Sequence, residues 1–141
     1  MFLFNLIDMN LVYGTILMTP DHKVLLVKGR HSGKWSFPKG HPNEGETGFD
    51  CARRETYEET GYTVSPFFNR IIHLQTGIYY LLNSDEFAIK PIDTNEIADS
   101  AWIPVESMRN MSINVDVSTF LRQHTPTKSI TPKYTIKPIY L

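Results

Sequence analysis

The apolar residues of the chain gather into short runs separated by turn-forming residues. Residues 11–18 and 24–28 are rich in β-branched and aliphatic side chains, and residues 19–22 between them read Thr-Pro-Asp-His. Runs of this length, joined by residues that favour a turn, are typical of paired strands. We therefore expect a β-hairpin over residues 11–28.

Three more strands are expected later in the chain. Residues 67–75 and 78–82 are apolar runs, and the Thr-Gly pair at 76–77 between them suits a two-residue turn. Residues 100–105 resemble one further short strand, which Pro104 would end because proline cannot donate a ladder hydrogen bond.

Two segments predict helices. Residues 47–60 contain no proline and no glycine besides Gly48, and Gly61 follows where a left-handed C-cap would end a helix. The remainder from 106 to 124 predicts a second amphipathic helix from its apolar residues at 113, 117, 120 and 121.

The segment from Gly29 to Gly48 predicts a long structured loop. It carries five glycines and two prolines, too many for a helix or a long strand, although residues 35–37 suit a short strand. Long loops inside compact domains are uncommon and usually functional. This loop is therefore the first candidate for a site.

Composition places the chain among ordinary folded proteins. Its 141 residues suffice for one domain over 1–141, and 41% of them are hydrophobic and 21% charged. A net charge of -1 exerts no general attraction on nucleic acid, so a polyanion would need a local patch or a bound metal. The single cysteine, Cys51, suits a small buried residue in a reducing interior.

The two ends of the chain add less. Residues 1–11 are apolar but lack the basic start and cleavage site of a signal peptide, and no stretch is long and apolar enough to span a membrane. We expect a cytoplasmic protein that contacts neither DNA nor a membrane. Residues 125–141 form a C-terminal extension or an edge strand, and Lys128, Lys133 and Lys137 there would either contact RNA phosphates or aid solubility.

Carboxylates gather on one stripe of the first predicted helix. At 100° per residue, Glu55, Glu58 and Glu59 occupy an arc of about 100°. Three neighbouring carboxylates repel one another and need a counter-charge. Hard divalent ions such as Mg²⁺ and Mn²⁺ bind through a few carboxylates together with substrate phosphates. The alternative is a solvated acidic surface, which is common on helices.

The loop before this helix supplies further candidates. Gly40 and Gly45 let the backbone turn tightly and offer carbonyl or amide groups, and Lys39 adds a positive charge. Glu46 suits a helix cap, a metal ligand or a partner of Arg54, whose guanidinium can fix acidic neighbours through bidentate hydrogen bonds.

The spacing of these residues resembles a known motif. Five residues separate Gly40 from Glu46, seven separate Glu46 from Arg54, and the run from Arg54 continues Glu-Thr-Tyr-Glu-Glu-Thr-Gly-Tyr. This pattern resembles the Nudix box at every fixed position and argues against a mere surface helix. Thr56 and Tyr62 depart from it, since the box usually has bulky aliphatic residues there.

The resemblance implies a fold and a chemistry. Nudix hydrolases fold as an α/β/α sandwich around a mixed sheet, bind Mg²⁺ or Mn²⁺, and cleave nucleoside diphosphates linked to another moiety. By matching positions, Glu55, Glu58, Glu59 and the Gly40 carbonyl would be metal ligands, and Arg54 with Glu46 an orienting pair. Glu96, just before Trp102, lies where several members place a catalytic base; the alternative is a solvated loop glutamate.

Substrate assignment rests on further local similarity. The chain looks more like the catalytic domain of mRNA-decapping enzymes than like a general member over residues 23–29, 35–40, 50–52, 58–61 and 95–97. That similarity implies cleavage of capped RNA to methylated GDP and 5′-monophosphate RNA. Lys-Gly-His at 39–41 also resembles dinucleoside polyphosphate hydrolases, and diphosphoinositol polyphosphate is a third option that would favour more basic residues.

The remaining expectations concern contacts and partners. Lys28, Trp35 and Phe37 are candidate substrate-binding residues beside Lys39, although aromatic residues next to a proline more often pack in a core. Because no strong basic stripe is visible, an activating protein partner would supply RNA affinity. A Nudix-like module that binds a nucleotide without cleaving it is disfavoured, because the chain keeps every glutamate of the box.

Overall fold

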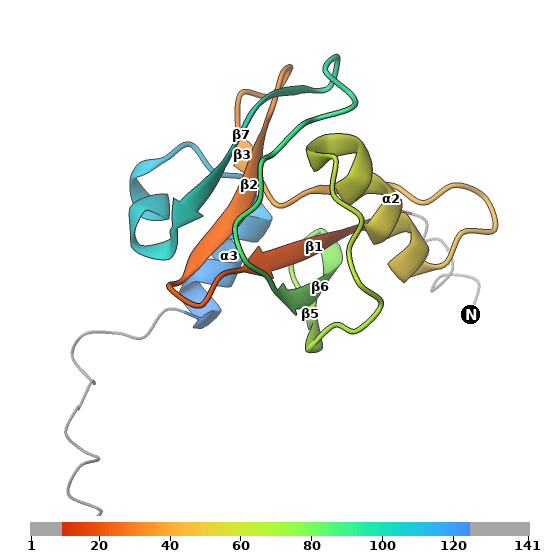
Figure 1. Ribbon diagram of the computed structural model, residues 1–141, viewed down its shortest axis with the longest axis horizontal. Helices are drawn as coiled ribbons and strands as arrows, with labels where there is room; N and C mark the ends of the chain where they lie inside the picture. The colour runs from red at the N-terminus through yellow and green to blue at the C-terminus, as the bar shows by residue number, and fades with distance from the viewer. Residues whose placement is uncertain (1–9, 125–141) are drawn as a thin grey trace, which may run out of the picture.

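The structure is a computed structural model, and it describes residues 10–124 (Figure 1). The expectations for the first nine residues and for the C-terminal extension, with Lys128, Lys133 and Lys137, lie outside these described residues. Within the described range, no helix is long and apolar enough to cross a membrane.

A mixed sheet forms the centre of the molecule. Its strands are β1 (Val12–Met18), β2 (Lys23–Gly29), β3 (Trp35–Ser36), β4 (Lys39–Gly40), β5 (Arg70–His73), β6 (Gly77–Asn83) and β7 (Ile97–Pro104). The order is β3-β2-β1-β6-β5, with β4 beside β1 and β7 beside β2. Strands β1 and β6 run parallel, whereas the other pairs are antiparallel.

The predicted hairpin is present, but its two strands separate soon after the turn. Strands β1 and β2 pair at Met18 and Val24, next to the turn. Further along, β1 pairs with β4 at Gly40, while β2 pairs with β7 along its whole length. The sheet therefore opens toward the end that carries Gly29 and Gly40.

Two helices and one 3₁₀ helix complete the described fold. They are α2 (Gly48–Thr60), η1 (Val105–Asn110) and α3 (Val115–His124). Thr47 caps α2 by accepting a hydrogen bond from the Asp50 amide, and Gly61 ends it with φ of 80°. The predicted helix and its left-handed C-cap are thus confirmed.

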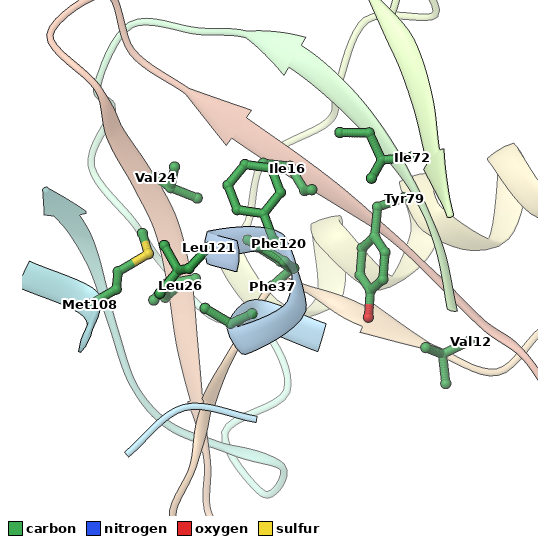
Figure 2. Close-up of a cluster of buried hydrophobic side chains, with 11 residues drawn as sticks. Val12, Ile16, Val24, Leu26, Phe37, Ile72, Tyr79, Met108, Phe120 and Leu121 are labelled. Atoms are coloured by element: carbon green, nitrogen blue, oxygen red, sulfur yellow. The ribbon is translucent and has the colours of Figure 1, made fainter. Parts of the chain in front are cut away.

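Side chains of the sheet pack on both of its faces. Adjacent residues of a strand point to opposite faces, so Ile16 joins the core beside α3 and Leu17 joins the core beside α2. Figure 2 shows the first of these cores, in which Phe37 packs against both Tyr79 and Phe120. Helices therefore cover both faces of the sheet, and the expected α/β/α sandwich with a mixed sheet is confirmed.

Four boundaries differ from the sequence-based expectations. Strand β5 covers only Arg70–His73 of the expected residues 67–75. The turn between β5 and β6 falls at residues 75–76, because the Leu74 amide already donates to the Gly77 carbonyl. Strand β7 is longer than expected and begins at Ile97. The region from 106 to 124 is split into η1 and α3, because the Asn114 side chain accepts a hydrogen bond from the Val117 amide and starts a new helix there.

Candidate active site

The loop before α2 is tied to the helix by a bidentate ion pair. The Nε and Nη2 of Arg54 donate to the two carboxylate oxygens of Glu46 at 2.8 and 2.9 Å. Glu46 also accepts from the Asn43 amide, and Arg54 Nη2 reaches the His41 carbonyl at 3.1 Å. Of the alternatives for Glu46, the geometry selects arginine binding, and this pairing lowers the pKa of Glu46.

Arg54 also contacts two of the helix glutamates. Its Nη1 lies 3.0 Å from Glu55 Oε2 and 3.4 Å from Glu58 Oε2. One guanidinium thus touches three carboxylates, of Glu46, Glu55 and Glu58, and its pKa is raised, chiefly by the hydrogen bonds with Glu46. Two of the three carboxylates predicted to share one face of the helix, Glu55 and Glu58, are therefore gathered around a single positive charge.

Glu59 is the most buried of these carboxylates. Only 8% of the residue is exposed, and its Oε1 accepts a hydrogen bond from the Lys39 amide at 3.3 Å. Burial, followed by repulsion from Glu55, raises the pKa of Glu59 to about 9. Burial also raises the pKa of Glu55, with which Glu59 shares a hydrogen bond. Burial and their mutual repulsion therefore disfavour ionisation of both groups at once.

Gly40 lies directly against Glu55. A Cβ atom added at this position would overlap the Glu55 carboxylate, so any larger residue here would displace that side chain. The Gly40 carbonyl contacts the Cys51 thiol at 3.4 Å. Cys51 is buried as expected, and burial raises the pKa of its thiol to about 12, which removes it as a nucleophile at neutral pH.

The donor set suits a hard divalent cation. The site offers oxygen ligands only, as Mg²⁺ and Mn²⁺ prefer, from Glu55, Glu58, Glu59 and the Gly40 carbonyl, and burial raises the pKa values of Glu55 and Glu59. Within residues 10–124, no group of three or more acidic, histidine or cysteine side chains is arranged closely enough to hold a metal ion. The reason is that Arg54 attracts two of the carboxylates while Glu59 faces the Lys39 amide.

A cavity of about 630 Å³ opens above these carboxylates. Its lining combines the three helix glutamates with residues from three loops, and it includes Arg30, His31, Lys34, Lys39, Gly40, His41, Glu55, Glu58, Glu59, Asp93 and Glu96. Both basic side chains and carboxylates contribute to this lining. Such a cavity can receive a phosphate chain on its basic groups and a cation on its acidic ones.

Glu96 lines this cavity from the segment before β7. The residue is exposed, and its carboxylate makes no hydrogen bond or ion pair with any other residue in the described part of the chain. Its proximity to the helix glutamates was expected from the family pattern and not from the sequence spacing itself.

The predicted substrate contact of Phe37 needs correction, whereas those of Lys28 and Trp35 stay predictions. Phe37 is fully buried and packs edge-on against Tyr79 and Phe120, so it has no surface on which a base could stack. Lys28 and Trp35 face each other on β2 and β3 and do not contribute to the lining of the cavity. Packing in the core, the alternative considered for the aromatic residues, accounts for Phe37.

Other residues of the site were not anticipated. Arg30, His31 and Lys34 belong to the glycine-rich loop that was suspected as a whole, but no pattern singled them out. Asp93 was likewise missed, because its segment is mixed in composition. What brings these residues together is the pairing of β2 with β7, a contact between distant parts of the chain.

The two departures from the Nudix box are accommodated by packing. Thr56 is fully buried, and its hydroxyl donates to the Ala52 carbonyl and bonds with the Thr15 hydroxyl, both at 2.7 Å. Tyr62 stacks on Phe87 with ring centroids 4.2 Å apart. A polar and an aromatic residue thus replace aliphatic ones without leaving a buried group unpaired.

Comparison with known proteins agrees with the fold and the motif. The model of the NUDIX domain matches residues 10–123. The chain therefore belongs to the Nudix hydrolase family, and the resemblance found in the sequence is confirmed.

Relatives with known activities include mRNA-decapping enzymes. The chain is 35% identical over 107 residues to the m7GpppN-mRNA hydrolase dcap-2 of Caenorhabditis elegans, covering 68% of this chain and 14% of that protein. It is 30% identical over 107 residues to the m7GpppN-mRNA hydrolase of Saccharomyces cerevisiae, covering 70% of this chain and 11% of that protein. The chain thus spans only a small part of the length of these relatives.

Solved structures share the fold. An Ap4A hydrolase of Caenorhabditis elegans superposes with a TM-score of 0.63 at 21% identity, covering 79% of this chain and 93% of that one. The NUDIX domain of Shewanella oneidensis NrtR, complexed with ADP ribose, superposes with a TM-score of 0.67 at 19% identity, covering 86% of this chain and 88% of that one. At such identities the likeness shows the fold alone.

Proposed function

We propose that this domain hydrolyses a diphosphate linkage in a nucleotide-type substrate with the aid of Mg²⁺ or Mn²⁺. The observation that carries the proposal is the set of carboxylates with raised pKa values, Glu55 and Glu59, at the base of a cavity that also holds basic side chains. Ionised carboxylates are costly to bury, and a bound cation would offset that cost. A solvated surface helix would show neither feature.

Each residue of the site has a role in this proposal. Glu55, Glu58, Glu59 and the Gly40 carbonyl would hold the ion, and rotation of the long glutamate side chains away from Arg54 would bring them together. When bound, the ion supplies positive charge to the phosphate oxygens and acidity to a water molecule. Arg54, held by Glu46, keeps the carboxylates from repelling one another in the absence of the ion.

The remaining groups would act on the substrate and on the proton. Lys39 and the basic residues of the 30–34 loop face the same cavity and would bind phosphate oxygens, whose charge attracts them. Glu96 would accept the proton of the attacking water, since its carboxylate lines the cavity without a partner of its own among residues 10–124. Phe37 is left out of this scheme because it is buried.

We further propose capped RNA as the substrate, with methylated GDP and 5′-monophosphate RNA as products. This assignment is supported by the similarity to two m7GpppN-mRNA hydrolases at 35% and 30% identity. Because the chain has a net charge of -1, an activating protein partner would supply the additional affinity for RNA. The protein would act in the cytoplasm.

A dinucleoside polyphosphate is the second candidate substrate. The Lys-Gly-His sequence at 39–41 favours it, and both Lys39 and His41 line the cavity. Diphosphoinositol polyphosphate is less well supported, because carboxylates contribute as much to the lining as basic side chains do.

The test supplies Mg²⁺ or Mn²⁺ and offers capped RNA, diadenosine tetraphosphate, nucleoside triphosphates and a diphosphoinositol polyphosphate side by side. The proposal expects turnover of capped RNA in preference to the free cap dinucleotide, and a loss of about 10²-fold or more in kcat for Glu59→Gln. Glu106→Gln, at an exposed residue of η1, is the matched control. Turnover of diadenosine tetraphosphate without turnover of capped RNA would select the second candidate. Equal rates in the wild type and all variants would defeat the metal assignment.

A further inference from the structure

The segment that carries Glu96 is fastened on one side to the C-terminal end of α2. The Ile92 and Asp93 amides both donate to the Glu58 carbonyl at 2.9 Å, and the Lys90 amide donates to the Thr60 carbonyl at 2.9 Å. The last carbonyls of a helix have no partner within the helix, so they are free to accept these bonds. The segment is thereby joined to the helix that bears the acidic stripe.

The segment also holds its own shape. The Asp93 side chain accepts hydrogen bonds from the Asn95 and Glu96 amides, each at 3.2 Å, and the Asp93 carbonyl accepts from the Ile97 amide. Asp93 thus forms a tight turn around the residues that precede β7. These bonds fix the direction of the Glu96 backbone, but they do not attach the turn to the other walls of the cavity.

Arg30 makes that attachment from the opposite side. Its amide donates to the Glu96 carbonyl at 2.8 Å, its Nε donates to the Thr94 carbonyl at 3.0 Å, and its Nη2 donates to the Ile97 carbonyl at 3.3 Å. Three carbonyls of one short segment are therefore bound by one residue. The loop that follows β2 and the segment that precedes β7 lie side by side at the top of Figure 1.

We infer that Arg30 is a positioning residue that holds the segment from Asp93 to Ile97, and with it Glu96, over the cavity. The inference rests on the proposed function, in which Glu96 accepts a proton. The Glu96 carboxylate has no partner of its own in the described part of the chain, so its place depends on the backbone that Arg30 holds. The planar guanidinium suits this task because its donors point in fixed directions to two carbonyls at once.

Arg30 also lines the cavity, so direct binding of a substrate phosphate is the competing role. The two roles differ in what a substitution changes. A phosphate contact made in the ground state as well as the transition state alters KM, whereas a displaced base alters kcat. The two roles also differ in whether the effect of Arg30 depends on the presence of Glu96.

The experiment compares Arg30→Met, Arg30→Lys, Glu96→Gln and the double variant Arg30→Met/Glu96→Gln on whichever substrate the full chain turns over. We expect Arg30→Met to lower kcat by about tenfold with little change in KM, because misplacing a reacting group is costly. Arg30→Lys should recover only part of the loss. In the Glu96→Gln background, Arg30→Met should have an effect below about twofold.

Hydrogen exchange of the segment from 90 to 97 provides a readout that does not require activity. Its amides should exchange faster in Arg30→Met than in the wild type, and the matched control Arg53→Met should leave them unchanged. Arg53 is exposed on α2 and lies outside the cavity lining.

The outcomes separate two kinds of failure. Unchanged exchange in Arg30→Met, additive effects in the double variant, or a change in KM alone would overturn the inference while leaving the proposed function intact. Wild-type turnover by Glu96→Gln would instead refute the proposed base, and the inference would fall with it.

Discussion

Replacing Arg54 with methionine should expose how much the site depends on one guanidinium. This group donates to Glu46 twice, to Glu55 and Glu58, and to the His41 carbonyl. Methionine keeps much of the aliphatic volume but removes the charge and every donor. Three carboxylates then lie close together without the positive charge that now separates them.

The size of the effect follows from the burial of the pair. The Arg54 and Glu46 side chains are 26% and 15% exposed, so the pair is neither free in water nor sealed in the core. Exposed pairs contribute about 0–1 kcal/mol, and removing one partner of a buried pair costs about 3–5 kcal/mol. We expect Arg54→Met to lower the free energy of unfolding by about 2–3 kcal/mol, between these limits.

Urea unfolding of a double-mutant cycle measures this contribution. Glu46→Gln, Arg54→Met and the double variant should give a coupling free energy of about 1–2 kcal/mol, since the two residues share a bidentate contact. Arg53→Met, on the exposed face of the same helix, should change stability by less than about 0.5 kcal/mol. A coupling near zero, or equal effects of Arg54→Met and Arg53→Met, would refute the reasoning.

Three further changes test separate parts of the site. In EDTA, stability should fall as the pH rises from about 4.5 toward 9, because the raised pKa of Glu59 makes the folded state bind more protons than the unfolded chain in that interval. Addition of Mg²⁺, or the change Glu59→Gln, should flatten this dependence of stability on pH in thermal melts. A slope of opposite sign would contradict the assignment. Gly40→Ala should lower kcat/KM by about 10²-fold, because its Cβ would displace the Glu55 carboxylate, and unchanged kinetics would argue against that contact. Thr56→Val should cost about 1–3 kcal/mol in urea unfolding by leaving the Thr15 hydroxyl unpaired, and the double change Thr15→Val/Thr56→Val should cost less than the sum of the two single changes.

The elements that the sequence predicted are those governed by local rules. The helix over α2 was marked by an uninterrupted run and by Gly61 at its end, and both features depend only on neighbouring residues. The pairing of Glu46 with Arg54 was one of the alternatives left open for Glu46, and the Nudix resemblance implied it. The second helix was predicted too long, because the apolar pattern gave no sign that Asn114 starts a new helix, α3.

The features that the sequence could not reveal are contacts between distant segments. Phe37 is buried because it meets Tyr79 and Phe120, and nothing within its own loop shows that. Arg30 binds the Thr94 carbonyl across 64 residues of sequence. Spacing within one helix predicts which side chains share a face, but the walls of a cavity are set by strand pairing.

Binding of Mn²⁺, measured by titration of the full chain at neutral pH, tests the central claim most directly. If the carboxylates of α2 hold the cation, Glu55→Gln and Glu59→Gln should each weaken binding by about tenfold or more, while Glu106→Gln should leave it unchanged. Equal affinities in the wild type and in all three variants would contradict the account.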